Sequence, residues 1–343
     1  NEAGNGSIGM EGMGKRLKIT RRQNVLVETR RGKEIFLQPK NFFLKRCVIT
    51  ASALPAILAA MLILLYPAPA AAAAAESRSE NKTPVTVAVV DTGIDEDNPA
   101  LDYTRVLPGK SYVEGEKSCN DKIGHGTAVA GIIQRYAPKA RIAPLMYYTA
   151  YASGVPRNGG IPAICKAIYD AVDNYQCKII SVSSGITSES DELKAAIDYA
   201  ESKGIIVVSA VGNDNKAASG RVYYPAAYDT VIGVGAVDAE NKIADFSQKN
   251  KSVTTVMSGV DIQVPSIKNG ARYTTVSGTS YAAAAICGIT AGIAEEYPDI
   301  TPAQFRNLIK SSCLDLGEPG YDIAYGYGIP DMEALEVNLR NIF

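Results

Sequence analysis

From Val85 onwards the chain alternates between two hydrophobic patterns. Nearly continuous apolar runs are typical of strands that are buried on both faces of a parallel sheet. Such runs occupy residues 85–90, 141–148, 178–183, 205–210 and 231–237. Between and after them, apolar residues recur at the three- and four-residue spacing of helices, at 161–174, 191–203, 280–297 and 301–312.

Strands that alternate with helices predict βαβ units. We therefore expect an α/β fold with a doubly wound, mostly parallel sheet and helices on both of its faces. The start of one helix can be placed closely. Thr301-Pro-Ala-Gln304 combines an N-cap residue, a proline in the first turn and a capping-box partner.

A different apolar pattern precedes this region. No charged residue lies between Val48 and Ala75, and residues 48–66 are long and apolar enough to span a bilayer as a helix. Lys45 and Arg46 on the N-terminal side place that side in the cytoplasm. Residues 47–75 are either a signal peptide cleaved in the alanine run or an uncleaved anchor. Both alternatives send everything after Glu76 out of the cytoplasm.

Charge supports this division of the 343 residues. Residues 1–46 hold eleven Lys/Arg and four Asp/Glu, a net charge of +7, which leaves −8 for the rest of a chain whose total is −1. An acidic body does not favour nucleic-acid binding. We expect a basic cytoplasmic leader at 1–46, the apolar segment at 47–75, a polar linker at 76–84 and one folded domain at 85–343.

The cysteines do not predict a metal site. Apart from Cys47, five remain, which cannot all pair within one domain. None has Cys-x-x-Cys spacing. We expect most of them to be small buried residues, although an exported protein could form one bridge.

Four segments carry candidate chemistry, and the expected fold brings several of them to one place. Active sites of open α/β sheets lie at the C-terminal ends of the strands. The first strand ends in Asp91, and the run at 205–210 leads into Asn213. His125, flanked by glycines, and Ser280 each stand where a helix is expected to begin.

His125 is the only histidine of the chain, so any imidazole base must be this residue. A lone histidine is most often structural, but its flanking glycines allow a close backbone approach. A serine hydroxyl becomes a good nucleophile when a neighbouring base takes its proton, and a carboxylate can hold the other ring nitrogen of that base. Ser280, His125 and Asp91 fit these three roles. The helix start at Ser280 and the amide of Asn213 offer donors to an oxyanion.

These segments resemble the signatures of the subtilisin-like serine peptidases, and their order of Asp, His and Ser is the order of that family. The resemblance covers about residues 84–340. It rests on Val87–Gly93, Gly124–Thr127, Ser209–Asn213 and Ser277–Ser280, with further matches at 224–226, 231–238 and 326–331.

The resemblance implies a serine endopeptidase with Asp91, His125 and Ser280 as its catalytic triad and Asn213 as oxyanion donor. It also implies a substrate-binding cleft. Ser183, Ser184 and Gly185 would form one side of it, pairing with the peptide as an added strand. Ala210, Val211 and Gly212 would line the primary specificity pocket. The alternative for these small residues is plain packing within a strand.

The sequence departs from the family's pattern at several positions. Ala128 stands where a second histidine is common, and Ala284-Ala285 stand where Pro-His is common. Tyr223 takes the place of a glycine at the base of the specificity pocket, which predicts a shallow pocket for small side chains. The short segment between Gly131 and Ile142 leaves no room for the family's usual calcium loop, so we expect no metal there and no cofactor. An acidic group at 95–97 is either a cation site or a solvated loop.

Two alternative functions remain open. A catalytically silent domain of this family could bind peptides while tethered to the membrane, although no triad member is missing. A membrane protein whose apolar segment is the functional part is disfavoured, because a single span without charges offers nothing for transport. We expect a monomer that acts on polypeptides outside the cytoplasm, that contacts the membrane through residues 48–66 if these are not cleaved, and that does not bind nucleic acid.

Overall fold

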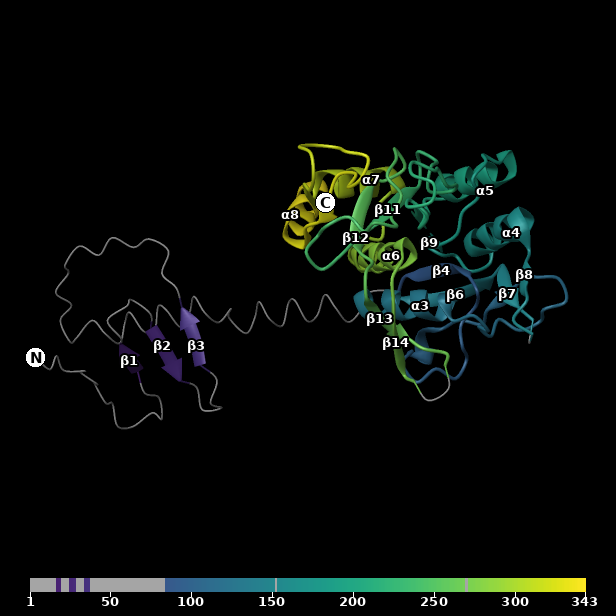
Figure 1. Cartoon of the computed structure of the whole chain (residues 1–343), viewed down its shortest axis with the longest axis horizontal. Helices are drawn as coiled ribbons and strands as arrows, with labels where there is room; N and C mark the ends of the chain where they lie inside the picture. The colour runs from purple at the N-terminus through teal and green to yellow at the C-terminus, as the bar shows by residue number, and fades with distance from the viewer. Residues whose placement is uncertain (1–16, 20–24, 29–33, 38–83, 152, 269–270) are drawn as a thin grey trace, which may run out of the picture. The chain divides into compact units, whose positions relative to one another are not determined.

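The computed structural model describes residues 17–19, 25–28, 34–37, 84–151, 153–268 and 271–343 (Figure 1). The chain divides into two compact units, Asn1–Arg78 and Ser79–Phe343. The apolar segment at 47–75 lies outside the described residues, so its role as signal peptide or anchor stays a prediction. Within the described part of the chain, no helix combines the length and the apolar character needed to cross a membrane.

The first unit contains a small antiparallel sheet. Its strands are β1 (Leu17–Ile19), β2 (Val25–Glu28) and β3 (Glu34–Leu37), in the order β1-β2-β3. The strong positive charge of residues 1–46 predicts only a basic leader here, whereas the short apolar runs form strands. The sheet is therefore a structural addition to that prediction.

A seven-stranded parallel sheet organises the second unit. Its order is β12-β11-β10-β9-β4-β6-β5. The strands are β4 (Thr86–Asp91), β5 (Lys110–Ser111), β6 (Arg141–Met146), β9 (Ile179–Val182), β10 (Ile206–Ala210), β11 (Ile232–Val237) and β12 (Thr255–Ser258). The five apolar runs of the sequence all lie in this sheet, and β4, β10 and β11 are buried along their whole lengths, as strands covered on both faces should be.

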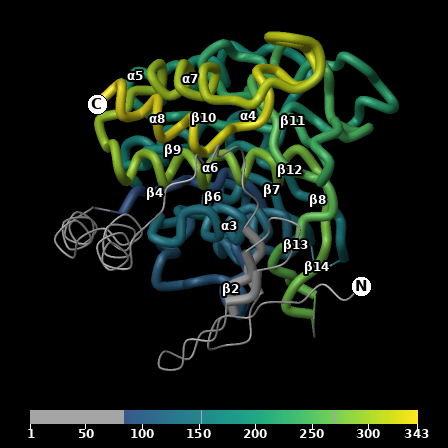
Figure 2. The backbone as a smooth tube through the Cα atoms, turned by 90° about the vertical axis from the view of Figure 1, so that its left-hand side faces the viewer, coloured from purple at the N-terminus to yellow at the C-terminus, as the bar shows by residue number. Residues whose placement is uncertain are grey.

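Helices cover both faces of the sheet, which confirms the predicted fold class. α3 (His125–Tyr136) and α6 (Thr279–Glu296) pack together on one face, where Figure 2 shows them as neighbours. α7 (Pro302–Ser311) and α8 (Met332–Ile342) extend the same apolar core. α4 (Gly160–Asp173) and α5 (Asp191–Ser202) bury their apolar residues in a second core on the other face.

Shorter elements complete the unit. They are η1 (Tyr103–Arg105) and three antiparallel pairs: β7 (Tyr148–Ala150) with β8 (Pro156–Asn158), β13 (Ile262–Pro265) with β14 (Tyr273–Val276), and β15 (Cys313–Leu314) with β16 (Ile329–Pro330).

Two local predictions are confirmed in detail. α7 begins with the expected capping box, in which the Thr301 side chain accepts from the Gln304 backbone and the Gln304 side chain accepts from the Thr301 backbone. The five described cysteines are all free, and Cys165, Cys177 and Cys287 are buried. Burial raises the pKa of Cys287 to about 12, so this thiol stays protonated in the apolar core.

Candidate active site

The parallel strands bring several predicted residues to one edge of the sheet. Asp91 is the last residue of β4, Ser183 follows β9, and Asn213 comes three residues after β10. Because parallel strands end at the same edge, their following loops meet there. The Asp91 side chain is buried, and its Oδ1 accepts a hydrogen bond from the backbone N–H of Thr92 at 2.8 Å.

His125 is the first residue of α3, and its ring contacts Asp91 directly. Nδ1 of His125 lies 2.7 Å from Oδ1 of Asp91. A proton on Nδ1 makes this a donation to the carboxylate, which leaves Nε2 as the acceptor nitrogen of the neutral ring. Burial lowers the pKa of His125, but the charge of Asp91 and the hydrogen bond to it outweigh burial. The pKa therefore lies above the ordinary value of 6.5.

The glycine after the histidine makes this contact sterically feasible. The N–H of Gly126 donates to Oγ1 of Thr92 at 2.8 Å, so the first turn of α3 lies against the end of β4. A Cβ at position 126 would stand only 2.2 Å from the carbonyl oxygen of Gly93. Any side chain here would push α3 away from Asp91, which explains the glycine that flanks the histidine.

Asp121 also holds the helix start, although the sequence analysis did not single it out. One carboxylate oxygen accepts from the backbone of Ile123 and Gly124, and the other accepts from the backbone and hydroxyl of Thr127. Burial raises the pKa of Asp121, although these hydrogen bonds act in the opposite direction. An aspartate four residues before the histidine was the available signal, since Asp favours such turns and helix starts.

Ser280 lies in the first turn of α6. Its side chain is buried, and its hydroxyl donates to the carbonyl oxygen of Ser183 at 3.3 Å. The ring of Tyr281, the next residue, lies 5.6 Å from the His125 ring between centroids. The beginnings of α3 and α6 therefore meet, which brings His125 and Ser280 into one neighbourhood.

The side chain of Asn213 reaches the same helix start. Its Oδ1 accepts from both the backbone N–H and the hydroxyl of Thr279, each at 2.8 Å. These bonds fix which end of the amide faces Thr279. Nδ2 is then the end that faces Gly278, where it lies 3.5 Å from the position of a Cβ built on that glycine. The amide can donate a hydrogen bond beside Ser280.

The predicted substrate-binding residues Gly185, Gly212 and Tyr223 also come together. A Cβ built on Gly185 would lie 2.9 Å from Cβ of Tyr223, and one built on Gly212 would lie 2.5 Å from its Cδ2. The tyrosine ring thus fills the space beside both glycines. Its hydroxyl interacts with Asp214, whose carboxylate also binds Gln248 and Arg221.

Two other predicted pocket residues, Ala210 and Val211, are buried. The Val211 side chain is buried in an apolar cluster with Ala226 and Val253, and that of Ala210 is buried in the main core. These two residues could face a substrate only through their backbone. Ser184 lies beside Gly185 in the segment that follows β9. Among the described residues, no group of three or more His, Cys, Asp or Glu is placed to hold a metal ion.

Comparison with known proteins identifies related sequences. The model of the subtilase family matches residues 82–328. Subtilisin DY of Bacillus licheniformis is 35% identical over 255 residues, which cover 73% of this chain and 90% of the relative. M-protease of Shouchella clausii (strain KSM-K16) is 34% identical over 259 residues, and the match spans 73% of this chain and 63% of that protein, less than two thirds of its length.

A solved structure agrees with this relationship. The crystal structure of a lanthipeptide protease superposes with a TM-score of 0.65 and 28% identity, covering 76% of this chain and 90% of the other.

Proposed function

The chain belongs to the subtilase family of serine-type endopeptidases. On that premise we propose that it hydrolyses peptide bonds through a triad of Ser280, His125 and Asp91. The observation that carries the proposal is the 2.7 Å contact between His125 Nδ1 and Asp91, with the start of α6 beside the same histidine. It supports the three roles that the sequence suggested.

In the proposed first step, the Ser280 hydroxyl turns from the Ser183 carbonyl towards Nε2 of His125. The imidazole takes the hydroxyl proton while Oγ attacks the carbonyl carbon of the substrate. Asp91 keeps the ring in the tautomer with Nε2 unprotonated and stabilises the imidazolium that forms. His125 then gives the proton to the leaving amine, and Ser280 retains the acyl group.

The oxyanion of each tetrahedral intermediate needs donors already in position. Asn213 Nδ2 and the backbone N–H of Ser280, in the first turn of α6, can serve this role. The hydrogen bonds from Thr279 orient the amide before substrate binds, so little reorganisation is needed during the reaction. In the second step water attacks the acyl group, and His125 again acts as base and then as acid.

The position of Tyr223 supports a preference for small substrate side chains. Its ring occupies space beside Gly185, which is expected on one side of the substrate cleft, and beside Gly212, which is expected in the specificity pocket. The contact of its hydroxyl with Asp214 ties the far end of the ring to the protein. A large substrate side chain would have to displace an anchored aromatic ring.

The proposed site of action is outside the cytoplasm. This part rests on the sequence alone, because the apolar segment at 47–75 follows a basic leader. A silent peptide-binding role is the alternative, but no position of the triad or of the oxyanion donor has been lost.

Substitution of Asp91 by asparagine tests the triad. Asparagine keeps the shape of the side chain but cannot hold His125 in the required tautomer, so kcat for a peptide substrate should fall by about 10⁴-fold. Asp97→Asn is the matched control, because it removes an exposed carboxylate six residues further along the chain. Equal activity of the two variants would remove Asp91 from the mechanism.

A further inference from the structure

Tyr281 directly follows Ser280 in the first turn of α6, and its ring lies beside two groups of the proposed site. The ring centroid is 5.6 Å from that of His125, and the two ring planes are tilted by 45°. Cε2 of the same ring lies 3.4 Å from the position of a Cβ built on Gly278, a position that Asn213 Nδ2 approaches to 3.5 Å. One aromatic ring therefore borders both the histidine and the proposed oxyanion donor.

The Tyr281 side chain is only half-buried, so part of it is open to a substrate. Among the described residues, its hydroxyl has no hydrogen-bond partner. Burial and the charge of Asp91 raise the pKa of this phenol, so it stays neutral in the pH range of the proposed reaction. A substrate would meet an uncharged ring, and the contact would be mainly steric.

The chemistry of peptide hydrolysis determines which part of a substrate passes this ring. In the tetrahedral intermediate the acyl carbon carries the oxyanion, the leaving nitrogen and the acyl chain, besides Oγ of Ser280. The oxyanion faces Asn213, and the leaving nitrogen faces His125, which gives it a proton. Tyr281 borders these two groups. The residue that follows the cleaved bond is attached to the leaving nitrogen, so it lies against Tyr281.

Another tyrosine borders the acyl side. The Cβ positions of Gly185 and Gly212 lie close to the Tyr223 ring, and no atom of Tyr281 is among their nearest neighbours. Conversely, the atoms nearest to the Cβ position of Gly278 include Tyr281 but not Tyr223. The two rings therefore border different halves of a bound peptide.

We propose that Tyr281 limits the size of the substrate residue that follows the cleaved bond, so that glycine, alanine and serine are preferred there over large side chains. This inference rests on the proposed peptidase function. It adds a selectivity on the leaving side to the selectivity on the acyl side that Tyr223 supports. Preferred substrates carry small residues on both sides of the cleaved bond. A large side chain has to displace the Tyr281 ring from His125.

The test uses the full chain and two peptides with alanine before the cleaved bond and either alanine or phenylalanine after it. Mass spectrometry follows hydrolysis and identifies the bond that is cut. In Tyr281→Ala, kcat/KM for the phenylalanine peptide relative to the alanine peptide should rise by roughly tenfold. Tyr281→Phe should keep the preference of the unaltered chain, because it keeps the ring. An unchanged preference in Tyr281→Ala, or a preference lost in Tyr281→Phe, would overturn the inference.

Tyr169→Ala is the matched control. Tyr169 also belongs to a tilted aromatic pair, at 5.3 Å from the Tyr199 ring, but it lies on α4, on the other face of the sheet. The control should keep the preference of the unaltered chain, and an equal change in Tyr169→Ala and Tyr281→Ala would overturn the assignment. If Tyr281→Ala does not fold, Tyr281→Leu, which is apolar and lacks the ring, must shift the preference in the same direction.

Acyl transfer separates this inference from the proposed function. An alanine ester acylates Ser280, and the acyl group then passes to water or to an added amino acid amide. The amine nitrogen of the amide forms the new bond, His125 takes its proton, and Ser280 Oγ leaves and receives that proton. Because the amine enters where the leaving group departs, Tyr281→Ala should raise transfer to phenylalaninamide relative to alaninamide by roughly tenfold. An unchanged ratio in a chain that hydrolyses the ester would overturn the role of Tyr281 alone. A folded, unaltered chain that the ester does not acylate would overturn the proposed function and this inference with it.

Discussion

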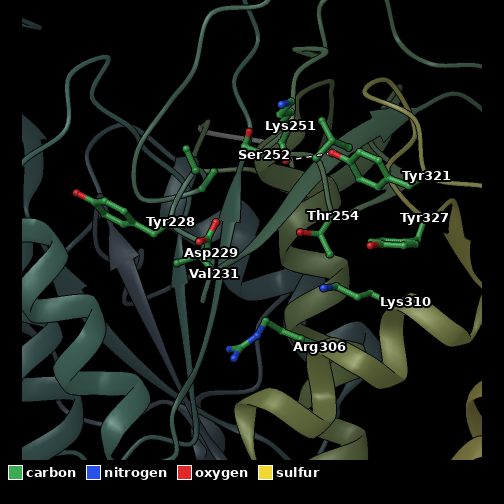
Figure 3. Close-up of a pocket in the computed structure, with 13 residues that line it drawn as sticks. Tyr228, Asp229, Val231, Lys251, Ser252, Thr254, Arg306, Lys310, Tyr321 and Tyr327 are labelled. Atoms are coloured by element: carbon green, nitrogen blue, oxygen red, sulfur yellow. Dashed lines mark hydrogen bonds between the residues drawn. The ribbon is translucent and has the colours of Figure 1, made fainter.

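The two edges of the parallel sheet carry polar clusters of different kinds. At the carboxyl ends of the strands, Asp91 and His125 partner each other at 2.7 Å, and Asn213 is held by Thr279. At the opposite edge, a pocket of about 220 Å³ is lined by Lys251, Arg306 and Lys310 (Figure 3), and within the described part of the chain only Arg306 of these three forms an ion pair. The first cluster is internally paired, as a site that stabilises charge during a reaction should be. The second is open to solvent, and its two lysines are exposed.

After substitutions in the proposed triad, Asn213→Ala should have the largest effect on catalysis. Loss of one oxyanion donor is expected to lower kcat by about 10²–10³-fold, with little effect on KM. The measurement is steady-state hydrolysis of a fluorogenic peptide. An unchanged kcat would mean that another group binds the oxyanion.

Much of the candidate active site, at the carboxyl ends of the strands, could be predicted because the sequence patterns that indicate it are local. The apolar runs specify buried strands, and Asp91 stands at the end of one of them. The glycines beside His125 lie next to it in the sequence, and the structure explains Gly126 by its 2.2 Å approach to the Gly93 carbonyl. The capping box at Thr301 is likewise complete within four residues.

The remaining features depend on contacts between distant segments. Asp121 positions the start of α3 through hydrogen bonds that require the folded loop. The pocket at the opposite edge is lined by Lys251, Lys310 and Tyr321, which are separated by many residues and share no sequence pattern. The three strands of the first unit were not predicted, because they are only three or four residues long and lie among many charged residues.

Tyr223→Gly tests whether the tyrosine ring limits the size of the proposed specificity pocket. Removing the ring opens the space beside Gly185 and Gly212, so kcat/KM for a peptide with phenylalanine before the cleaved bond should rise relative to alanine by roughly tenfold. Tyr223→Phe is the control, because it keeps the ring and loses only the hydroxyl contact with Asp214. Identical selectivity in Tyr223→Gly and the unaltered chain would place the specificity pocket elsewhere.

The most direct test of the catalytic account is labelling of the full chain by a fluorophosphonate probe over a range of pH. The probe reacts only with a serine that a base activates, and the base must be neutral. The pKa of His125 is raised by Asp91, so the labelling rate should increase with pH through a midpoint above 6.5.

We expect labelling at Ser280 that disappears in Ser280→Ala and slows strongly in Asp91→Asn. Labelling that persists in Ser280→Ala, or a folded protein that the probe does not modify at any pH, would contradict it.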